Sequence, residues 1–345
     1  MRANLKYLSI GLLVGGGMTA VVLLSAFLLS RSTRGAYATP LLASTQSATD
    51  TPLFALPTFT PLLATPTPAT WNLTPETWNL TPGTPPPVPP THLPDSLLAS
   101  QIASILPDYG GDWNLLIRAG GERDMVAINA DRVNHVASII KVPIAMLFFK
   151  VIEARGISTS DYYEYLSTRG VGRTYMQLLT AMLVESEEDA TGTMKEIIYD
   201  SKIDVDGLLA KWGAPHTDLG NRHSTPRDIA ALYETLYFGN VITPEGRAIL
   251  LDLLAAYTPN DDIRLGVLRP SLPAGAEFYN KRGTVTKDRL IVGDSALLAW
   301  DSNGTRRVYV IVTLAYGADE RPTTNVRLDR GIEAIARLFW DFVHS

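Results

Sequence analysis

The pattern of apolar and polar positions divides the chain into three parts. Residues 7–30 are apolar or small throughout, with basic residues on both sides. Residues 39–90 are rich in Thr and Pro and contain no Lys or Arg. Beyond them, apolar residues recur with the periods of helices and strands. The pattern therefore predicts an N-terminal apolar segment (1–35), a linker (36–93) and a globular domain (94–345).

The N-terminal segment is long enough to cross a membrane. Its run of about 24 residues would extend roughly 36 Å as a helix, whereas the hydrocarbon core of a bilayer is ~30 Å thick. The apolar part of a cleavable signal peptide is shorter, about 7–15 residues. We therefore expect an uncleaved transmembrane anchor. The alternative is a signal peptide cleaved after Ala36-Tyr37-Ala38, which has the A-x-A form of a cleavage site.

The linker cannot build a hydrophobic core. Frequent proline removes backbone donors and favours extended polyproline II conformation, so we expect a disordered, semi-rigid stalk. A stalk that follows an anchor would place the rest of the chain outside the cytoplasm. That rest is about 250 residues long, which is enough for one well-buried domain.

The globular domain begins and ends with strand patterns and is helical in the middle. A helix is expected near 95–106, followed by strands at 112–118 and 124–129, with Gly120-Gly121 between them. Further helices are expected at 138–154, 174–185, 191–199, 226–238 and 244–255. The closing elements are strands at 277–281, 291–300 and 307–315 and a helix at 326–343. This order predicts an α/β (α+β) fold with a mixed antiparallel sheet and a helical subdomain.

Composition excludes several classes of function. The net charge is −5, and no basic run with interleaved aromatic residues occurs, so nucleic acid is not an expected partner. The chain has no cysteine, which excludes disulfides, thiolate metal sites and a cysteine nucleophile. We expect neither a metal ion nor an organic cofactor, and we expect a monomer.

The candidate nucleophile is Ser138, in the segment Ala137-Ser138-Ile139-Ile140-Lys141-Val142-Pro143. Proline is tolerated in the first turn of a helix, so a helix should begin close to Ser138. Its backbone N–H groups and dipole would stabilise a developing oxyanion, and Lys141 would share the face of Ser138. A desolvated Lys141 could act as base. The alternative is a capping Ser138 and a solvated Lys141.

Two further motifs follow in order. Ser186-Glu187-Glu188 ends a helical run, and Lys281-Arg282-Gly283 lies on an expected strand. With the S-x-x-K motif, these segments resemble class A β-lactamases and penicillin-binding proteins, in which they would be S-D-N and K-T-G. The segment from Ser224 to Asp228 resembles the start of the helix after that family's omega loop, with Thr225 as cap. The resemblance extends over essentially 95–345.

The resemblance implies a role for each matching residue. Ser138 would be the acylated nucleophile, Lys141 its base, and Ser186 a hydroxyl that passes a proton toward the leaving nitrogen. The backbone N–H groups of Ser138 and Thr284 would form the oxyanion hole. Lys281 would bind the substrate carboxylate, next to Gly283. Without the resemblance, Ser186 would be a helix cap and Lys281 an exposed strand charge.

Three departures from the family's pattern bear on the activity. Glu188 stands in place of Asn, and it could either pair with Lys141 and raise its pKa or itself activate water. Arg282 replaces a hydroxyl residue and could hold a carboxylate with two hydrogen bonds. The segment 218–224 is too short for the omega loop and contains no E-x-x-x-N, so the family's usual deacylation base is missing.

The expected function is acyl-enzyme hydrolysis of β-lactams or related acyl-D-alanyl peptides by a membrane-anchored domain. The alternatives are a D,D-peptidase-like enzyme of the cell wall and a catalytically weak domain that binds such peptides. Gly293-Asp294-Ser295 resembles an esterase motif, but its place in a late strand argues against that reading. The histidines at 135, 216 and 223 match no triad or metal motif, so we interpret them as loop or surface residues.

Overall fold

The structure is a computed structural model that describes residues 96–345 except 122, 169, 171 and 257–261. The predicted anchor and stalk lie outside these residues. Among the helices of the described part, none combines the length and the hydrophobicity that a bilayer crossing requires.

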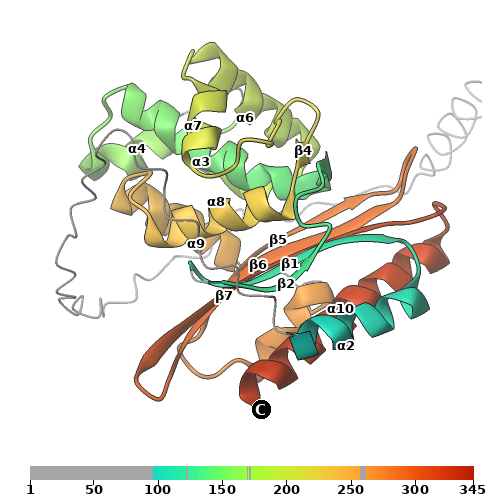
Figure 1. Cartoon of the computed structure of the whole chain (residues 1–345). Helices are drawn as coiled ribbons and strands as arrows, with labels where there is room; N and C mark the ends of the chain where they lie inside the picture. The colour runs from blue at the N-terminus through green and yellow to red at the C-terminus, as the bar shows by residue number, and fades with distance from the viewer. Residues whose placement is uncertain (1–95, 122, 169, 171, 257–261) are drawn as a thin grey trace, which may run out of the picture. The chain divides into compact units, whose positions relative to one another are not determined.

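The described elements follow the predicted order (Figure 1). The helices are α2 (Ser96–Tyr109), α3 (Lys141–Ala154), α4 (Tyr162–Leu166), α5 (Tyr175–Leu183), α6 (Glu188–Asp200), α7 (Val205–Lys211), α8 (Pro226–Phe238), α9 (Pro244–Ala255) and α10 (Pro322–His344). Short 3₁₀ turns are η1 (Ala137–Ile140), η2 (Thr159–Asp161) and η3 (Arg264–Ser271). The strands are β1 (Asp112–Ala119), β2 (Arg123–Ile128), β3 (Asn134–His135), β4 (His223–Ser224), β5 (Glu277–Val285), β6 (Ile291–Ser302) and β7 (Thr305–Tyr316).

The main sheet of the described chain has five strands in the order β2-β1-β7-β6-β5. All of its pairings are antiparallel, so the expectation of a mixed sheet is wrong in that respect. The reason is the connectivity: hairpins join β1 to β2 and β5 to β6 to β7, and β7 returns beside β1 without a parallel crossover. The helical block between β2 and β5 therefore separates two antiparallel ribbons that β1 and β7 join.

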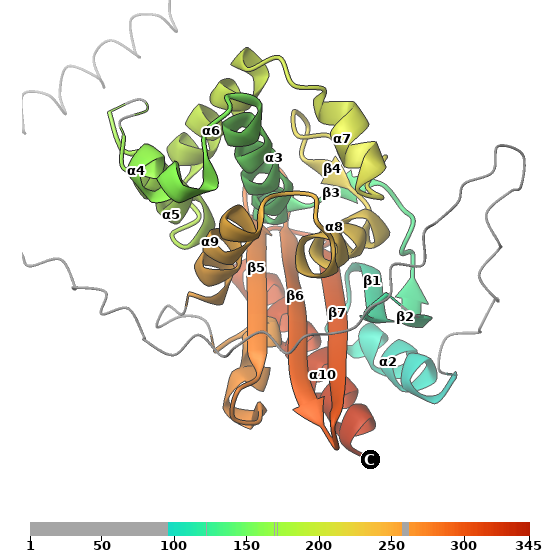
Figure 2. The same ribbon diagram turned by 90° about the vertical axis from the view of Figure 1, so that its left-hand side faces the viewer.

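Both faces of the sheet are covered (Figures 1 and 2). Leu115 and Ile117 of β1 pack into one core with α2 and α10, whereas Leu116 packs into a second core with the helical block. Successive side chains of a strand point to opposite faces, and here both faces are apolar. This explains why β6 is buried from Ile291 to Trp300. It also explains why the strands appear in the sequence as continuous apolar runs.

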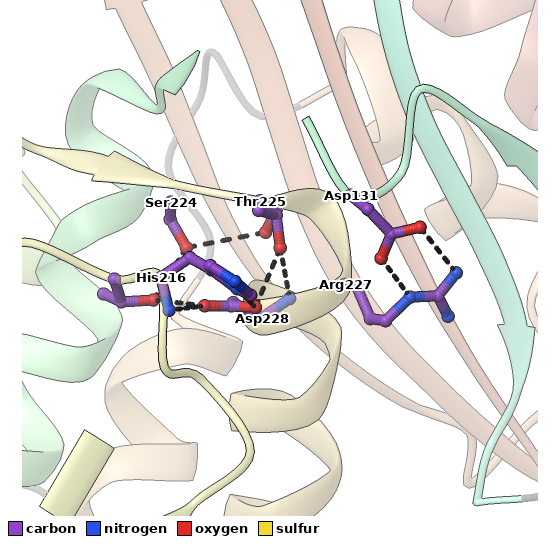
Figure 3. Close-up of polar contacts among 7 residues, drawn as sticks. Asp131, His216, Ser224, Thr225, Arg227 and Asp228 are labelled. Carbon is purple, nitrogen blue, oxygen red and sulfur yellow. Dashed lines mark hydrogen bonds and ion pairs between the residues drawn. The ribbon is translucent and has the colours of Figure 1, made fainter. Parts of the chain in front are cut away.

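Polar contacts at the start of α8 connect this helix to the loops that contain His216 and Asp131 (Figure 3). The Thr225 side chain caps the helix by accepting the Asp228 backbone N–H at 2.9 Å, and Pro226 occupies the first turn, as predicted. The Asp228 carboxylate accepts the Thr225 hydroxyl at 2.9 Å and the His216 backbone N–H at 2.7 Å. Arg227 pairs with Asp131 at 2.6 Å. The short strand β4, which precedes Thr225, pairs with β3.

Candidate active site

Ser138 lies in η1, which leads directly into α3. Pro143 falls in the first turn of α3, so Ser138 is close to the positive end of this helix, as predicted. Ala137 has φ of 52°, a left-handed conformation that costs a non-glycine residue about 1–2 kcal/mol. Its backbone N–H donates to His135 Nδ1 at 3.1 Å. Residues with such strained backbone conformations cluster at functional sites.

Gly283 allows β5 to approach the Ser138 turn closely. A methyl group at Gly283 would lie 2.9 Å from Ala137 Cβ and 3.0 Å from both Ser138 N and Val136 O. Two of these neighbours are backbone atoms that cannot move aside. Glycine is therefore required here by the close contact of β5 with η1. This contact brings together the two segments that the resemblance assigns to the oxyanion hole, at Ser138 and Thr284.

Lys141 is completely buried beneath this turn, so it is not the solvated charge of the alternative interpretation. Among the described residues, its Nζ donates to Ser186 O at 2.6 Å, Ser186 Oγ at 3.2 Å and Glu188 Oε1 at 2.8 Å. An ammonium has three donors, and these acceptors use all of them. Burial lowers the pKa of Lys141, whereas the hydrogen bond and charge of Glu188 oppose this shift.

Ser186 connects α5 to α6 in a left-handed conformation, with φ of 61°. The turn is held by the Glu187 backbone N–H, which donates to Ala181 O at 2.8 Å. In this geometry both oxygens of Ser186 contact the Lys141 amine. The structure therefore brings together the side chains of the first two motifs, which are 45 residues apart in the chain.

Glu188 lies between two cations at the first residue of α6. Its Oε1 accepts from Lys141 and, at 3.5 Å, from the Ser138 hydroxyl, while its Oε2 pairs with Arg222. Partial burial alone would raise the pKa of Glu188, but the hydrogen bonds from Arg222 and Lys141 outweigh it and lower the pKa to about 2. A carboxylate held in this way is a weak base. The geometry therefore favours the pairing with Lys141 over activation of water.

Arg222 was missed by sequence analysis, and it belongs to the short segment that stands where the family has its omega loop. A tight turn closes there, because backbone bonds of 2.8 and 3.1 Å join Asp218 and His223. The Asp218 carboxylate accepts from Gly220 N at 2.7 Å and from Asn221 Nδ2 at 2.6 Å. Asp218 is therefore used within its own turn, and a guanidinium rather than a carboxylate faces Glu188.

The third motif lies on β5, one of the two edge strands of the described five-stranded sheet. Lys281 is 5% exposed, so it is not an exposed strand charge. Arg264, which the sequence did not indicate, is also buried and contacts the end of this motif. Its guanidinium donates to Gly283 O at 3.0 Å and Thr284 Oγ1 at 2.7 Å, and it pairs with Asp329 at 2.6 Å. Arg264 therefore joins β5 to α10 and holds the strand on which the motif lies.

A cavity of about 790 Å³ connects these elements. This volume is within the range of small-molecule sites, about 300–1,000 Å³. The predicted site residues that line it come from all three motifs: Ser138, Ser186, Glu188, Lys281, Arg282 and Thr284. Lys141 is buried behind them, and Gly283 packs against η1. The cavity can therefore present a nucleophile, a buried amine and anion-binding side chains to one ligand.

Three of the described histidines are those that the sequence assigned to loops or to the surface. Within the described residues, no group of three or more His, Cys, Asp or Glu could hold a metal ion. His135 and His223 are partly exposed, but they pair in the two-stranded sheet of β3 and β4, with ring centroids 6.2 Å apart, and so belong to short strands rather than to loops. Only two residues form each strand, too few for a period to appear in the sequence. His216 lies in a loop, and its side chain is 58% exposed, as expected.

Comparisons with known proteins agree with this architecture. The TLA-3 extended-spectrum beta-lactamase has 14% identity and a TM-score of 0.58, with 73% of this chain and all of that chain covered. A class A beta-lactamase from Mycobacterium abscessus has 20% identity and a TM-score of 0.54, with 72% and 100% covered. PBP-A has 19% identity and a TM-score of 0.57, with 73% and 97% covered. At these low sequence identities, the structural similarity shows only that the fold is shared. A search of curated proteins gives no match.

A family model identifies the domain from its sequence. The model described as the beta-lactamase enzyme family, Beta-lactamase2, matches residues 97–343, which is most of the chain. The match extends from the first turn of α2 to the last turn of α10 and includes all three motifs. The chain belongs to the beta-lactamase enzyme family.

Proposed function

We propose that the domain is a serine hydrolase that forms an acyl-enzyme with β-lactams or related acyl-D-alanyl peptides. The observation that supports this most strongly is the arrangement of Ser138 and Ser186, which line the cavity, around the buried amine of Lys141. The Lys141 amine contacts both oxygens of Ser186, and Glu188 connects the amine to the Ser138 hydroxyl. Hydroxyl and amine groups of this kind act in nucleophilic catalysis when the amine can accept a proton.

In acylation, Ser138 Oγ would attack the carbonyl carbon while Lys141, in its neutral form, takes the hydroxyl proton. The carbonyl oxygen would become an oxyanion that accepts from the backbone N–H groups of Ser138 and Thr284. As the C–N bond breaks, Ser186 would pass the proton from Lys141 to the leaving nitrogen. Lys281 and Arg282 line the same cavity and supply positive charge for a substrate carboxylate.

Hydrolysis of the acyl-enzyme would be slow. The short turn at 218–223 uses its Asp218 carboxylate for its own hydrogen bonds, and Glu188 is neutralised by two cations. Neither group is suited to remove a proton from water. General-base assistance is typically worth 10²–10⁴-fold, and the loss would fall on the second step alone. The acyl-enzyme should therefore accumulate.

The test is the intact mass of the protein after incubation with benzylpenicillin. We expect an increase of one penicillin mass that persists over many minutes and that Ser138→Ala abolishes. A fluorophosphonate, which modifies activated serines of many classes, should also label wild type and not the variant. Labelling of Ser138→Ala would refute the assignment of the nucleophile. No adduct with either probe would refute acyl-enzyme chemistry.

The second candidate is a D,D-peptidase-like or peptide-binding domain of the cell wall. It is favoured by one observation, the three acceptors around Lys141, which stabilise the ammonium and so weaken the base. Release of D-alanine from an acyl-D-alanyl-D-alanine peptide would support the peptidase. Binding of this peptide without release, and without a penicillin adduct, would support the binding domain.

We also propose that residues 7–30 anchor the domain, as a monomer, on the outer side of a membrane. The proposal rests on the apolar length of this segment and on the stalk that follows it. Full-length protein should sediment with membranes, and mild proteolysis should release a monomeric domain of about 250 residues. A soluble product that begins at Thr39 would instead show cleavage after Ala38.

A further inference from the structure

Arg222 contacts Glu188 in the candidate site, although it belongs to none of the three motifs. It has φ of 56°, a left-handed conformation that is unfavourable for a residue with a long side chain. The turn around it is fixed by the Asp218–His223 backbone bonds and by the Asp218 carboxylate. The Val136 backbone N–H also donates to Arg222 O at 2.9 Å. Arg222 is thus attached to the segment that carries Ser138.

The Arg222 guanidinium pairs with the oxygen of Glu188 that Lys141 does not use. The carboxylate is therefore held at both ends, by Arg222 at Oε2 and by Lys141 at Oε1. Without Arg222, Glu188 could rotate and offer both oxygens and its whole charge to Lys141. An unshared negative charge next to an amine favours the protonated form, which cannot act as base.

We propose that Arg222 is a positioning residue that holds Glu188 and shares its charge, so that Lys141 can release its proton and activate Ser138. The inference rests on the proposed serine acyl-enzyme function. Arg222 would act through Glu188 and would not touch the substrate.

Other charged groups near Lys141 are arranged so that they do not replace Arg222. Glu187, on the same loop, is paired with Arg173 at 2.6 Å. From β3, burial and the charge of Arg222 lower the pKa of His135, which favours its neutral form. Lys281 and Arg282 of β5 line the cavity, and so does Glu185 in the loop between α5 and α6. Among the described residues, Glu188 is the charged group that contacts the amine, and Arg222 is paired with the other oxygen of Glu188.

The experiment is the rate of fluorophosphonate labelling of the full-length protein in detergent, measured against pH. Labelling reports the activation of Ser138 without requiring a β-lactam substrate. In Arg222→Gln, Lys141 should keep its proton to higher pH, so the midpoint of the profile should rise by about one unit. At pH 7 the rate should fall about tenfold, because the neutral fraction of Lys141 falls tenfold per unit. Arg222→Lys, which keeps the charge, should recover most of the rate.

Two controls separate this role from a structural one. In a Glu188→Gln background, Arg222→Gln should no longer move the midpoint, because there is no carboxylate charge to share. Arg173→Gln removes an arginine–glutamate pair at the neighbouring residue Glu187 and should leave the profile unchanged.

Each outcome decides a different claim. An unchanged midpoint in Arg222→Gln, or the same shift in the Glu188→Gln background, would overturn the role of Arg222. Labelling by fluorophosphonate with no adduct from penicillin would refute the β-lactam substrate class and leave the Arg222 test intact. No labelling of wild type at any pH would overturn both the activated serine and the positioning role.

Discussion

Replacement of Glu188 by glutamine tests the most unusual group in the site. Glutamine has nearly the same shape and can still accept from Lys141 and Ser138, but it has no charge. It also places an amide where the class A family has one. We expect Glu188→Gln to lower the pKa of Lys141 and to accelerate acylation, because the amine loses its anionic partner.

The size of the effect follows from the geometry. A charge within about 4–6 Å shifts a neighbouring pKa by roughly 1–3 units. Glu188 Oε1 is 2.8 Å from Lys141 Nζ, but the Glu188 side chain is 55% exposed and also paired with Arg222. Solvent screening and the second partner both weaken the pair, so the lower end of the range applies. A shift of about one unit corresponds to about tenfold faster acylation below the pKa of Lys141.

The assay is the rate of penicillin adduct formation, followed by mass from pH 5 to pH 10. Glu187→Gln is the matched control, because Glu187 is a neighbouring carboxylate that pairs with Arg173 and not with Lys141. It should change the rate by less than about twofold. Unchanged or slower acylation in Glu188→Gln would refute the idea that Glu188 keeps Lys141 protonated. Selective loss of hydrolysis, with acylation intact, would instead identify Glu188 as the base for deacylation.

Three further predictions follow from the described residues. Gly283→Ala should abolish labelling of Ser138 and destabilise the domain by about 1–3 kcal/mol. The control is Gly192→Ala, in α6 with open space around it, which should be neutral or stabilising. Equal effects of the two substitutions in urea unfolding would contradict the close contact of β5 with η1. Complete burial raises the pKa of Asp294 to about 6, above its unfolded value of about 3.9, so the free energy of unfolding should fall as pH rises from about 4 to 6. Asp294→Asn should lack this slope, and an identical slope in both proteins would refute the assignment. Penicillin cleavage should show a burst near one equivalent followed by slow turnover, and rapid burst-free turnover would exclude slow deacylation.

Much of the fold could be predicted from periodicity and turn residues alone. The long helices and the strands of the main sheet appear at nearly the predicted positions, because each buries an apolar stripe or face. The short helices α4 and α7 were not predicted, since five and seven residues give too little periodicity. The antiparallel pairing of β1 with β7 depends on contacts almost 200 residues apart, which no local pattern contains.

Part of the candidate site could also be predicted from the sequence, and part could not. Ser138 and Lys141 could be found because their motif stands at a helix start that Pro143 marks locally. Arg222 and Arg264 could not, since each acts on groups in other parts of the chain, 34 residues away at Glu188 and 65 residues away at Asp329. Both have a left-handed backbone, Arg222 in a turn and Arg264 at the start of η3, and sequence alone does not show where such an arginine side chain will point.

The two departures from the family's pattern near Lys141 are physically connected. A carboxylate at Glu188, next to a buried amine, would by itself favour the ammonium and suppress a base mechanism. The shortened turn, however, brings Arg222 to the outer oxygen of that same carboxylate. The amine therefore faces an anion whose charge is already shared, which is closer in its effect to the neutral amide of the family than to a free carboxylate. If the long loop had been lost without the gain of a cation, or the glutamate gained without the short turn, Lys141 would be a poorer base. In the proposed mechanism the two changes therefore act as one rearrangement: Arg222 offsets the effect of Glu188 on Lys141, and the short turn lacks the family's usual base for activating water in deacylation.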